Sequence, residues 1–240
     1  MRITEQLEML IISSDNNAIY PTLIWDENNL VLVDACFPQQ MDLLEAAINK
    51  AGYTAKDITK IILTHQDLDH IGCAIDILGL NPDVQIIAHE EEAPYIDGRE
   101  TPIKMAVREA NRENLSEEEQ GRLDTMKESY KAHCVSIGKT VTAGEILACC
   151  GGIKIIHTPG HTPGHICLYV KEGGILIAGD ALNLNSGALT RPNPVYTYNM
   201  ELAVDSLRQL KNYDIHKVIT YHGGLFEGNF QKALCAITQE

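Results

Sequence analysis

The stretch Thr64-His65-Gln66-Asp67-Leu68-Asp69-His70 decides how this sequence is interpreted, because metal-capable side chains are concentrated in it. It follows residues 60–63, a short and mostly apolar run that predicts a buried strand. Ligands of open α/β sheets bind beyond the carboxyl ends of strands, and imidazole and carboxylate groups commonly bind zinc, iron or manganese. The stretch therefore predicts a metal site at the end of this strand.

A simpler interpretation is a turn in which Asp67 or Asp69 accepts hydrogen bonds from backbone amides. Short motifs also match by chance, so the stretch alone does not decide between the two. The metal site is favoured because further candidate ligands follow in the sequence. They are His161 in Thr158-Pro159-Gly160-His161-Thr162-Pro163-Gly164-His165, Asp180 in Leu176-Ile177-Ala178-Gly179-Asp180, and His222 in Ile219-Thr220-Tyr221-His222-Gly223-Gly224.

In this order the motifs resemble those of the metallo-β-lactamase superfamily, whose signature is His-x-His-x-Asp-His followed by a His, an Asp and a last His. The first block here is His65-x-Asp67-x-Asp69-His70, so Asp67 stands where most members have His. The resemblance spans nearly the whole chain. It implies an α/β fold, a four-layer αβ/βα sandwich in which two mixed β-sheets pack face to face with helices outside.

The strand and helix patterns agree with such a sandwich. Strands are predicted at residues 7–12, 19–25, 30–34, 60–63, 84–88, 139–147, 152–156, 166–170, 175–178 and 218–221, with a turn at Asp15-Asn16-Asn17. Helices are predicted at residues 39–51, 71–78, 200–210 and 226–237. Because the sequence contains no repeat and no linker, we expect a single domain over residues 1–240.

Residues 90–133 interrupt the strand pattern with two predicted helices, one starting near Thr101-Pro102 and one with a capping box at Ser116 and Glu119. This insertion leaves the strand that ends at His89, so we expect its helices to lie over the metals as a lid, with apolar residues lining a pocket wall. The alternative is an outer decoration or a dimer contact. The apolar residues concerned are Met105, Val107, Leu115, Leu123, Met126 and Tyr130.

Composition limits the classes of partner. The net charge of −14 argues against nucleic acid, because phosphate binding needs clustered Lys and Arg. No apolar run approaches the ~20 residues that span a bilayer, and the N-terminus has no signal-peptide pattern, so we expect no membrane partner and a cytoplasmic location. The expected partner is a small-molecule substrate, and a homodimer remains open.

The resemblance also implies the ligand set. It assigns one metal to His65, Asp67 and His161, the other to Asp69, His70 and His222, and makes Asp180 the bridge between them. Two divalent metals about 3.5–4 Å apart lower the pKa of a shared water, and the implied reaction is attack of the resulting hydroxide on a carbonyl carbon. Asp69 is the residue expected to handle the proton.

Other polar residues are predicted to lie just outside the ligands. His165 begins a strand next to the second motif and is expected to support the ligands, as is His157. His89 follows a strand but has no place in the signature, so it is expected to have a supporting or structural role. Asp34 ends a strand and is expected to hold the following loop by hydrogen bonds to the backbone.

Asp67 bears on the identity of the metal. With three carboxylates instead of two, the formal charge of a two-metal site with its hydroxide falls from about +1 to about 0. Such a site acidifies water less, and its oxygen donors suit iron or manganese better than a third imidazole does. Zinc is the expected metal, with iron or manganese as alternatives because of Asp67. An acidic residue here is also a feature of the superfamily's di-iron flavoproteins, whose flavodoxin domain has no counterpart in this sequence.

The expected function is therefore that of a dinuclear metal-dependent hydrolase acting on an ester, a thioester, a lactone or a similar small substrate. Quorum-quenching lactonases of the superfamily carry a Tyr where this chain has Asn183, so the sequence does not select one substrate. One alternative is an iron-dependent, oxygen-using enzyme of the same fold, similar to a persulfide dioxygenase. Another is a metal-binding protein with weak catalytic activity.

Overall fold

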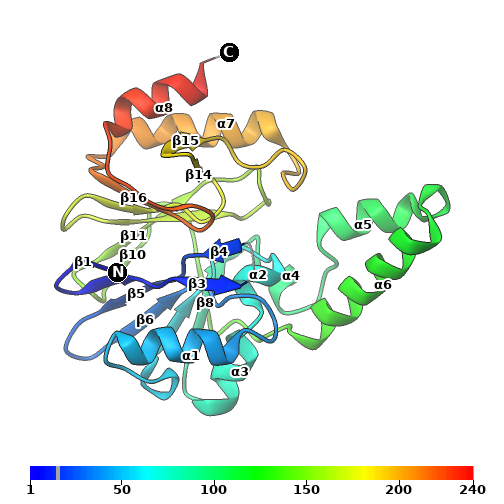
Figure 1. Cartoon of the computed structure of the whole chain (residues 1–240), viewed down its shortest axis with the longest axis horizontal. Coiled ribbons are helices and arrows are strands. Elements are labelled where there is room, and N and C mark those ends of the chain that lie inside the picture. The colour runs from blue at the N-terminus through cyan, green and yellow to red at the C-terminus, as the bar shows by residue number, and fades with distance from the viewer. Residues whose placement is uncertain (15–16, 240) are drawn as a thin grey trace.

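The computed structural model describes residues 1–14 and 17–239, and two β-sheets packed face to face form the centre of this part of the chain (Figure 1). Helices cover the outer side of each sheet, which gives the four layers of an αβ/βα sandwich. The predicted fold class is therefore confirmed.

The first sheet comes from the N-terminal part of the chain and has the order β1-β2-β5-β6-β7-β8-β9. From β6 to β9 the strands run parallel, so the carboxyl ends of β6, β7 and β8 meet at one edge of the sheet. The bounds are β1 Arg2–Thr4, β2 Leu7–Met9, β5 Thr22–Trp25, β6 Leu30–Val33, β7 Lys60–Ile62, β8 Gln85–His89 and β9 Lys139–Val141.

The second sheet has the order β10-β11-β12-β13-β16-β17 and is antiparallel except for the parallel pair β13 and β16. Its bounds are β10 Ile146–Leu147, β11 Ile153–His157, β12 Ile166–Val170, β13 Ile175–Ile177, β16 Lys217–Thr220 and β17 Gly224–Phe226. Two short ribbons lie outside the sheets. They pair β3 (Ile12–Ser14) with β4 (Asn17–Ile19), and β14 (Asn183–Asn185) with β15 (Ala188–Thr190).

The outer helices bury one apolar face each, as their spacing of apolar residues predicts. On the first sheet, α1 (Met41–Lys50) buries Leu44 and Ile48, and α3 (Ala74–Leu80) lies beside it. On the second sheet, α7 (Met200–Arg208) buries Val204 and Leu207 and lies next to α8 (Phe230–Thr238). Short helices α2 (Leu68–Ile71) and α4 (Ala93–Ile96) and 3₁₀ turns at Ala55–Asp57, Arg112–Asn114 and Gln209–Asn212 complete these layers.

Between α4 and β9 the chain forms α5 (Ile103–Ala110) and α6 (Glu117–Ala132), which pack together and project from the sandwich (Figure 1). We call residues 101–132 the arm. The capping box predicted for its second helix is confirmed, because Ser116 and Glu119 accept hydrogen bonds from each other's backbone amides. No helix in the described ranges is long and apolar enough to cross a membrane.

Central strands are apolar along their whole length because both of their faces are covered. All residues of β6 and β12 are buried, one face against the opposite sheet and the other against helices. The layer between the sheets includes Val31 and Ile62 from the first sheet and Ile155 and Leu168 from the second. This packing fixes the two sheets relative to each other, and it therefore fixes the loops that leave their carboxyl ends.

Several predicted boundaries were wrong. The runs at 7–12 and 19–25 are each divided between two strands, because Pro21 has no N–H to donate to a ladder. The run at 139–147 crosses from β9 in the first sheet to β10 in the second. The last helix begins at Phe230 rather than at Phe226, since Phe226 ends β17 and Asn229 caps the helix. The turn predicted at residues 15–17 lies largely outside the described residues.

Candidate metal centre

The candidate ligands lie in loops from both sheets. His65 follows β7, Asp180 follows β13 and His222 follows β16, each just beyond the carboxyl end of its strand, while His161 lies in the loop between β11 and β12. Gly179 allows one of these loops to pass close to the others, since its φ is +50° and a Cβ there would lie 2.8 Å from Nε2 of His165. The centre therefore forms only where the two sheets meet.

The first ligand group consists of His65, His161 and Asp180, each of which offers one ligand atom within 4.8 Å of the others. Asp67 points into this group, with its Oδ2 atom 3.1 Å from Nε2 of His161 and 3.5 Å from Nε2 of His65. The sequence-predicted ligands of the first metal are thus brought together.

The second ligand group consists of Asp69, His70 and His222, again with ligand atoms within 4.8 Å of one another. The Oδ2 atom of Asp69 lies 3.1 Å from Nε2 of His222 and 3.6 Å from Nε2 of His70. Behind the group, the phenol of Tyr221 donates a hydrogen bond of 2.6 Å to the carbonyl oxygen of Asp69, and its ring packs on His70 with the centroids 3.9 Å apart. The sequence-predicted ligands of the second metal are also brought together.

Hydrogen bonds on the outer ring nitrogens orient two of the imidazoles. Nδ1 of His65 lies 3.1 Å from the hydroxyl of Thr64, and Nδ1 of His70 lies 2.9 Å from Oδ2 of Asp34. Asp34 also accepts a 2.8 Å hydrogen bond from the backbone amide of Thr64, which ties it to the first motif. Outer partners of this kind leave each Nε2 atom directed toward the centre, as in histidines that bind metals.

Asp180 joins the two groups. Its Oδ1 atom lies 3.4 Å from Nε2 of His70, and its Oδ2 atom lies 3.6 Å from Nε2 of His161 and 3.5 Å from Nε2 of His222. Within the described residues, the buried atoms Nε2 of His65, Nε2 of His70 and Oδ1 of Asp180 have no hydrogen-bond partner. Unpaired buried polar atoms are costly, and several directed at one centre suit metal ions. The two groups therefore fit metal binding, and Asp180 lies between them.

The charges of the centre favour ionised carboxylates. Burial opposes ionisation of Asp180, but His70 and His222 hold the pKa of its carboxyl well below its usual range. Burial lowers the pKa of His65 to about 4, helped by repulsion from His70. For His222 burial also lowers the pKa, but Asp180 and Asp69 outweigh it and raise the value to about 9. A metal that binds His222 must therefore displace a proton, so metal binding releases protons.

The residues predicted to support the ligands differ in their positions. Nε2 of His165 accepts a hydrogen bond from the amide of Asp180 at 3.0 Å, so His165 orients a ligand loop, and Asp34 orients both a loop and a ligand ring as described above. His89 does not touch the ligands. It stacks on His157, with ring centroids 4.1 Å apart, and forms a separate cluster with Glu91.

Glu92 links the two ligand loops of the first group and was missed at the sequence level. Its side chain is fully buried and accepts hydrogen bonds from the amides of Gln66, at 3.0 Å, and Gly164, at 2.7 Å. Burial raises the pKa of Glu92 to about 8, even though these two hydrogen bonds act in the opposite direction. Nothing in the local sequence signals this contact, because Glu92 lies next to Glu90 and Glu91 in what resembles an exposed acidic run.

Lys104 is a second residue missed at the sequence level. It lies in the first turn of α5 and forms an ion pair with Oδ2 of Asp67. Burial opposes ionisation of Asp67, but the Lys104 ammonium and the hydrogen bonds from His161 and His65 hold its pKa well below the usual range. The arm therefore reaches the centre through a charged side chain rather than through an apolar one.

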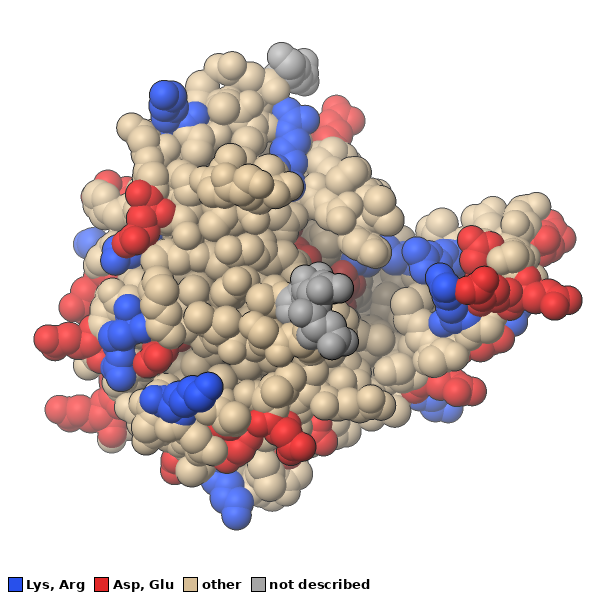
Figure 2. All heavy atoms as spheres, in the orientation of Figure 1, with Lys and Arg blue, Asp and Glu red and all other residues tan. Residues whose placement is uncertain are grey.

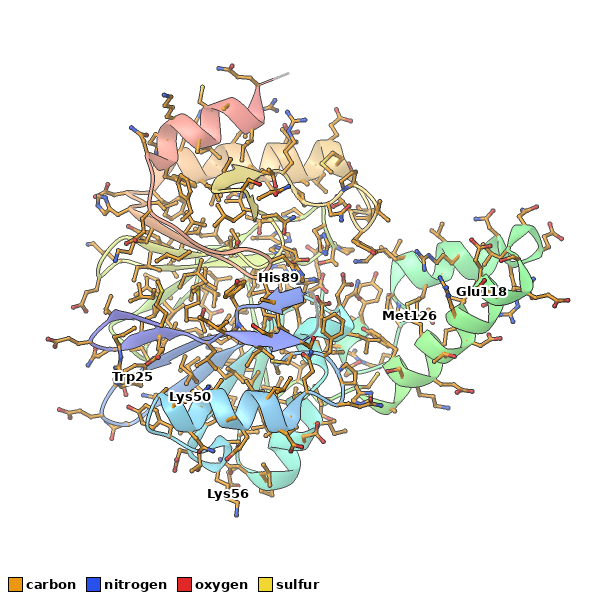
Figure 3. All side chains as sticks on the ribbon, viewed as in Figure 1. Trp25, Lys50, Lys56, His89, Glu118 and Met126 are labelled. Atoms are coloured by element: carbon orange, nitrogen blue, oxygen red, sulfur yellow. The ribbon has the colours of Figure 1, made fainter. Side chains whose placement is uncertain are left out.

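The expected pocket wall from the insertion is not what the structure has. Met105, Leu123 and Tyr130 are buried in the apolar cluster outside the first sheet, while Leu115 and Met126 pack against that cluster. Figure 3 places Met126 between the helices of the arm and Glu118 near its outer end. Val107 is 55% exposed. Apart from Val107, these apolar residues hold the arm together and attach it to the sandwich, so they are not free to line a pocket.

A cavity of about 850 Å³ opens beside Asp180 and His222 instead. The β14–β15 ribbon, the segment after it and the end of α8 form its walls. Among these residues, Arg191 donates hydrogen bonds to backbone carbonyls of Ile237 and Gln239, and Tyr196 is 53% exposed. The walls are Asn183, Leu184, Asn185, Thr190, Arg191, Pro192, Asn193, Pro194, Tyr196, Ala236 and Ile237.

Comparison with known proteins agrees with this geometry. The family model of the metallo-beta-lactamase superfamily matches residues 16–222, which include every candidate ligand. The chain belongs to this superfamily. The "Probable metallo-hydrolase YflN" of Bacillus subtilis (strain 168) is 28% identical over 238 residues, which cover 91% of this chain and 84% of that protein. A hydroxyacylglutathione hydrolase of Chelativorans sp. (strain BNC1) is also 28% identical, over 97% of this chain and 71% of the relative.

Solved structures of the superfamily share the fold. A metallo-beta-lactamase family protein from Thermus thermophilus superposes with a TM-score of 0.78 at 24% identity, covering 97% of this chain and 78% of the other. At this identity the match supports the fold alone. In this chain, loops beyond the strands of both sheets carry the candidate ligands.

Proposed function

We propose that this chain is a dinuclear metal-dependent hydrolase of a small carbonyl substrate such as an ester, a thioester or a lactone, with zinc as the resident metal. The observation that carries the proposal is the pair of ligand groups that share Asp180 and direct unpaired buried atoms toward one centre. The name of the Bacillus subtilis relative, a metallo-hydrolase, supports the same reaction class.

Bound metals would supply Lewis acidity and an activated water for attack on a carbonyl carbon. The protein itself supplies the remaining functions. Asp69 has its Oδ2 atom 3.1 Å from Nε2 of His222, at the boundary between the ligands and solvent, so it is placed to accept a proton and to return it to the leaving group. His222 is the ligand next to the cavity, and its side chain is 38% exposed. A substrate carbonyl would therefore approach from the cavity on the side of His222.

The shape of the cavity supports a small substrate. Its walls combine apolar side chains such as Leu184 and Ile237 with the amides of Asn183 and Asn193, which offer both donors and acceptors. Such a surface suits a neutral carbonyl compound with an apolar part. No residue of the arm is among the residues that line this cavity, so a substrate bound there would not need the arm.

The test is a metal assay on protein purified without added metal, followed by a panel of esters, thioesters and lactones. We expect close to two metals per chain and turnover of at least one class of substrate. His161→Ala and Asp180→Ala should lower both the metal count and the activity. Full metal loading in both variants would show that the ligand assignment is wrong.

Asp67 favours a second candidate function, because a third carboxylate suits iron better than a third imidazole does. An iron-dependent, oxygen-using enzyme of this fold would contain iron as purified, consume oxygen with a persulfide substrate and release sulfite. A protein that holds metals and turns over neither the hydrolase panel nor the persulfide would be a metal-binding protein with weak activity.

A further inference from the structure

Lys104 occupies an unusual place relative to the ligand that it contacts. Its ammonium forms an ion pair with Oδ2 of Asp67, and that same oxygen is directed at Nε2 of His161 and Nε2 of His65. The Lys104 ammonium therefore pairs with the oxygen atom that a metal would use. It comes from the arm, 37 residues farther along the chain.

The residues that orient other ligands behave differently. Asp34 binds His70 through the outer nitrogen Nδ1 and leaves Nε2 directed inward, and Thr64 does the same for His65. A supporting partner contacts the far side of a ligand and so leaves the metal-facing atom free. Lys104 instead pairs with Oδ2 itself, the oxygen that lies nearest Nε2 of His161 and Nε2 of His65, so its charge opposes a metal at that oxygen while the ion pair lasts.

We propose that Lys104 competes with the first metal for Oδ2 of Asp67, so that loading of this metal releases α5 of the arm from the centre. The inference rests on the metal centre proposed above. An ammonium and a divalent ion that share one carboxylate oxygen repel each other. Binding of the first metal therefore weakens or opens the ion pair, and the affinity of the first site is reduced by the cost of doing so.

Loss of the ion pair would remove one of the ties that hold α5, which also packs through the buried Met105 and against α6. Tyr130 of α6 is buried and donates a hydrogen bond of 3.0 Å to the carbonyl oxygen of Tyr95 in the sandwich. The side chain of Lys104 is 23% exposed and lies at the side facing the body of the molecule. Figure 2 shows a hollow between the arm and the sandwich, with basic side chains on the side of the arm and acidic ones deeper inside. This hollow gives the released lysine access to solvent.

The first test measures metal affinity by competition with a chelator, starting from metal-free protein. Lys104→Met should bind the first zinc ion about tenfold more tightly or better, the scale on which residues around a metal site change its affinity. Lys104→Arg keeps a cation and should stay near the wild type. Lys127→Met is the matched control, because Lys127 lies on the same arm and pairs with Glu109 at 3.1 Å, away from the centre.

The second test measures amide hydrogen exchange of residues 101–111 with and without zinc. Zinc should speed exchange in α5 of the wild-type protein, whereas Lys104→Met should exchange fast in both states. Arg122→Met is the control here, because Arg122 pairs with Glu118 within α6 and makes no ion pair with α5 in the described residues. Unchanged or weaker first-site affinity in Lys104→Met, or slower exchange of α5 with zinc, would overturn the competition. These outcomes differ from failure of the metal centre itself, in which the wild type would bind no zinc.

Discussion

The first ligand group, around His65 and His161, and the second, around His70 and His222, use the same donor types in different surroundings. In the second group Asp34 contacts the outer nitrogen of His70, and Nε2 of His222 pairs with the ligand carboxylates Asp69 and Asp180. In the first group the carboxylate of Asp67 carries an ammonium on its inward oxygen. In the second group the inward atoms thus pair with one another, whereas in the first group a lysine of the arm pairs with one of them.

This difference shows that the identity of a ligand does not determine its availability. Judged by its charge alone, Asp67 lowers the formal charge of a two-metal site by about one unit relative to His. The Lys104 ammonium restores one positive charge while it stays close to the centre. It opposes metal binding at Asp67 while it is paired with Oδ2 of that residue. The properties of the first site therefore depend on a residue outside the motif.

The largest expected effect comes from removing the ligand that both groups share. Asp180→Ala takes away the carboxylate that lies within 3.6 Å of His70, His161 and His222. We expect a metal count clearly below two and a fall in metal affinity of more than the ~10–100-fold that is typical of supporting residues. Elemental analysis and chelator competition would measure this, with Asp214→Ala as an exposed control.

The next change, Asp34→Asn, alters the carboxylate that orients His70 in the second group. Asn at this position tolerates the φ of 61° but presents either an amide N–H or a weaker acceptor to Nδ1 of His70. Asp34→Asn should lower the affinity of the metal at the second group by about 10–100-fold. The first group should lose less, because Asp34 reaches His65 only through the hydroxyl of Thr64. Equal loss at both sites would show that the two groups are not supported separately. Asp42→Asn, on the exposed face of α1, is a suitable control.

Replacing Asp67 by His removes the partner of Lys104 and makes the donor types of the two groups differ. Asp67→His adds a third imidazole and removes the partner of Lys104, so the centre becomes more positive. We expect metal to be retained, the pH profile of kcat/KM to move to lower pH by about one unit, and zinc to be preferred over manganese more strongly. A pH profile and a metal preference identical to those of the wild type would mean that Asp67 is not a ligand.

The smallest effect on the centre is expected at Glu92, which supports only the first group. The folded-state pKa of this carboxyl, about 8, lies above its ordinary value of 4.5. Between these values the unfolded chain loses the proton and the folded protein keeps it, so the stability contributed below pH 4.5 is lost as pH rises toward 8. The total is a few kcal/mol at most, since one pKa unit corresponds to about 1.4 kcal/mol.

Glu92→Gln should therefore flatten the pH dependence of unfolding for the metal-free protein between about pH 5 and pH 8.5, as measured by chemical denaturation. It should also destabilise the protein by about 1–3 kcal/mol, because the Gln amide cannot accept hydrogen bonds from both Gln66 and Gly164. Glu91→Gln is the control, since Glu91 is exposed. The same pH slope in both variants would mean that Glu92 is ionised in the folded protein.

The strands and the ligand loops have local signals, while the fold class and the ligand set were predicted from the order of the motifs along the chain, which resembles that of the superfamily. A buried strand followed by polar residues, as at His65 and Asp180, marks the end of a strand without reference to the rest of the chain. The capping box at Ser116 is equally local. Lys104 and Glu92 could not be predicted, because their contacts depend on where the chain returns after long loops. The direction of the arm was also missed, since apolar residues on a helix do not tell which neighbour they pack against.

The assembly of the centre from both sheets has a consequence for the life of the protein in a cell. Bound metals would join loops of the first sheet to loops of the second and so act as a cross-link across the sandwich. A ligand that binds only the folded state stabilises it by mass action. Metal supply would then govern how long each molecule survives proteolysis, and chelation would expose the chain to degradation even where no substrate is present.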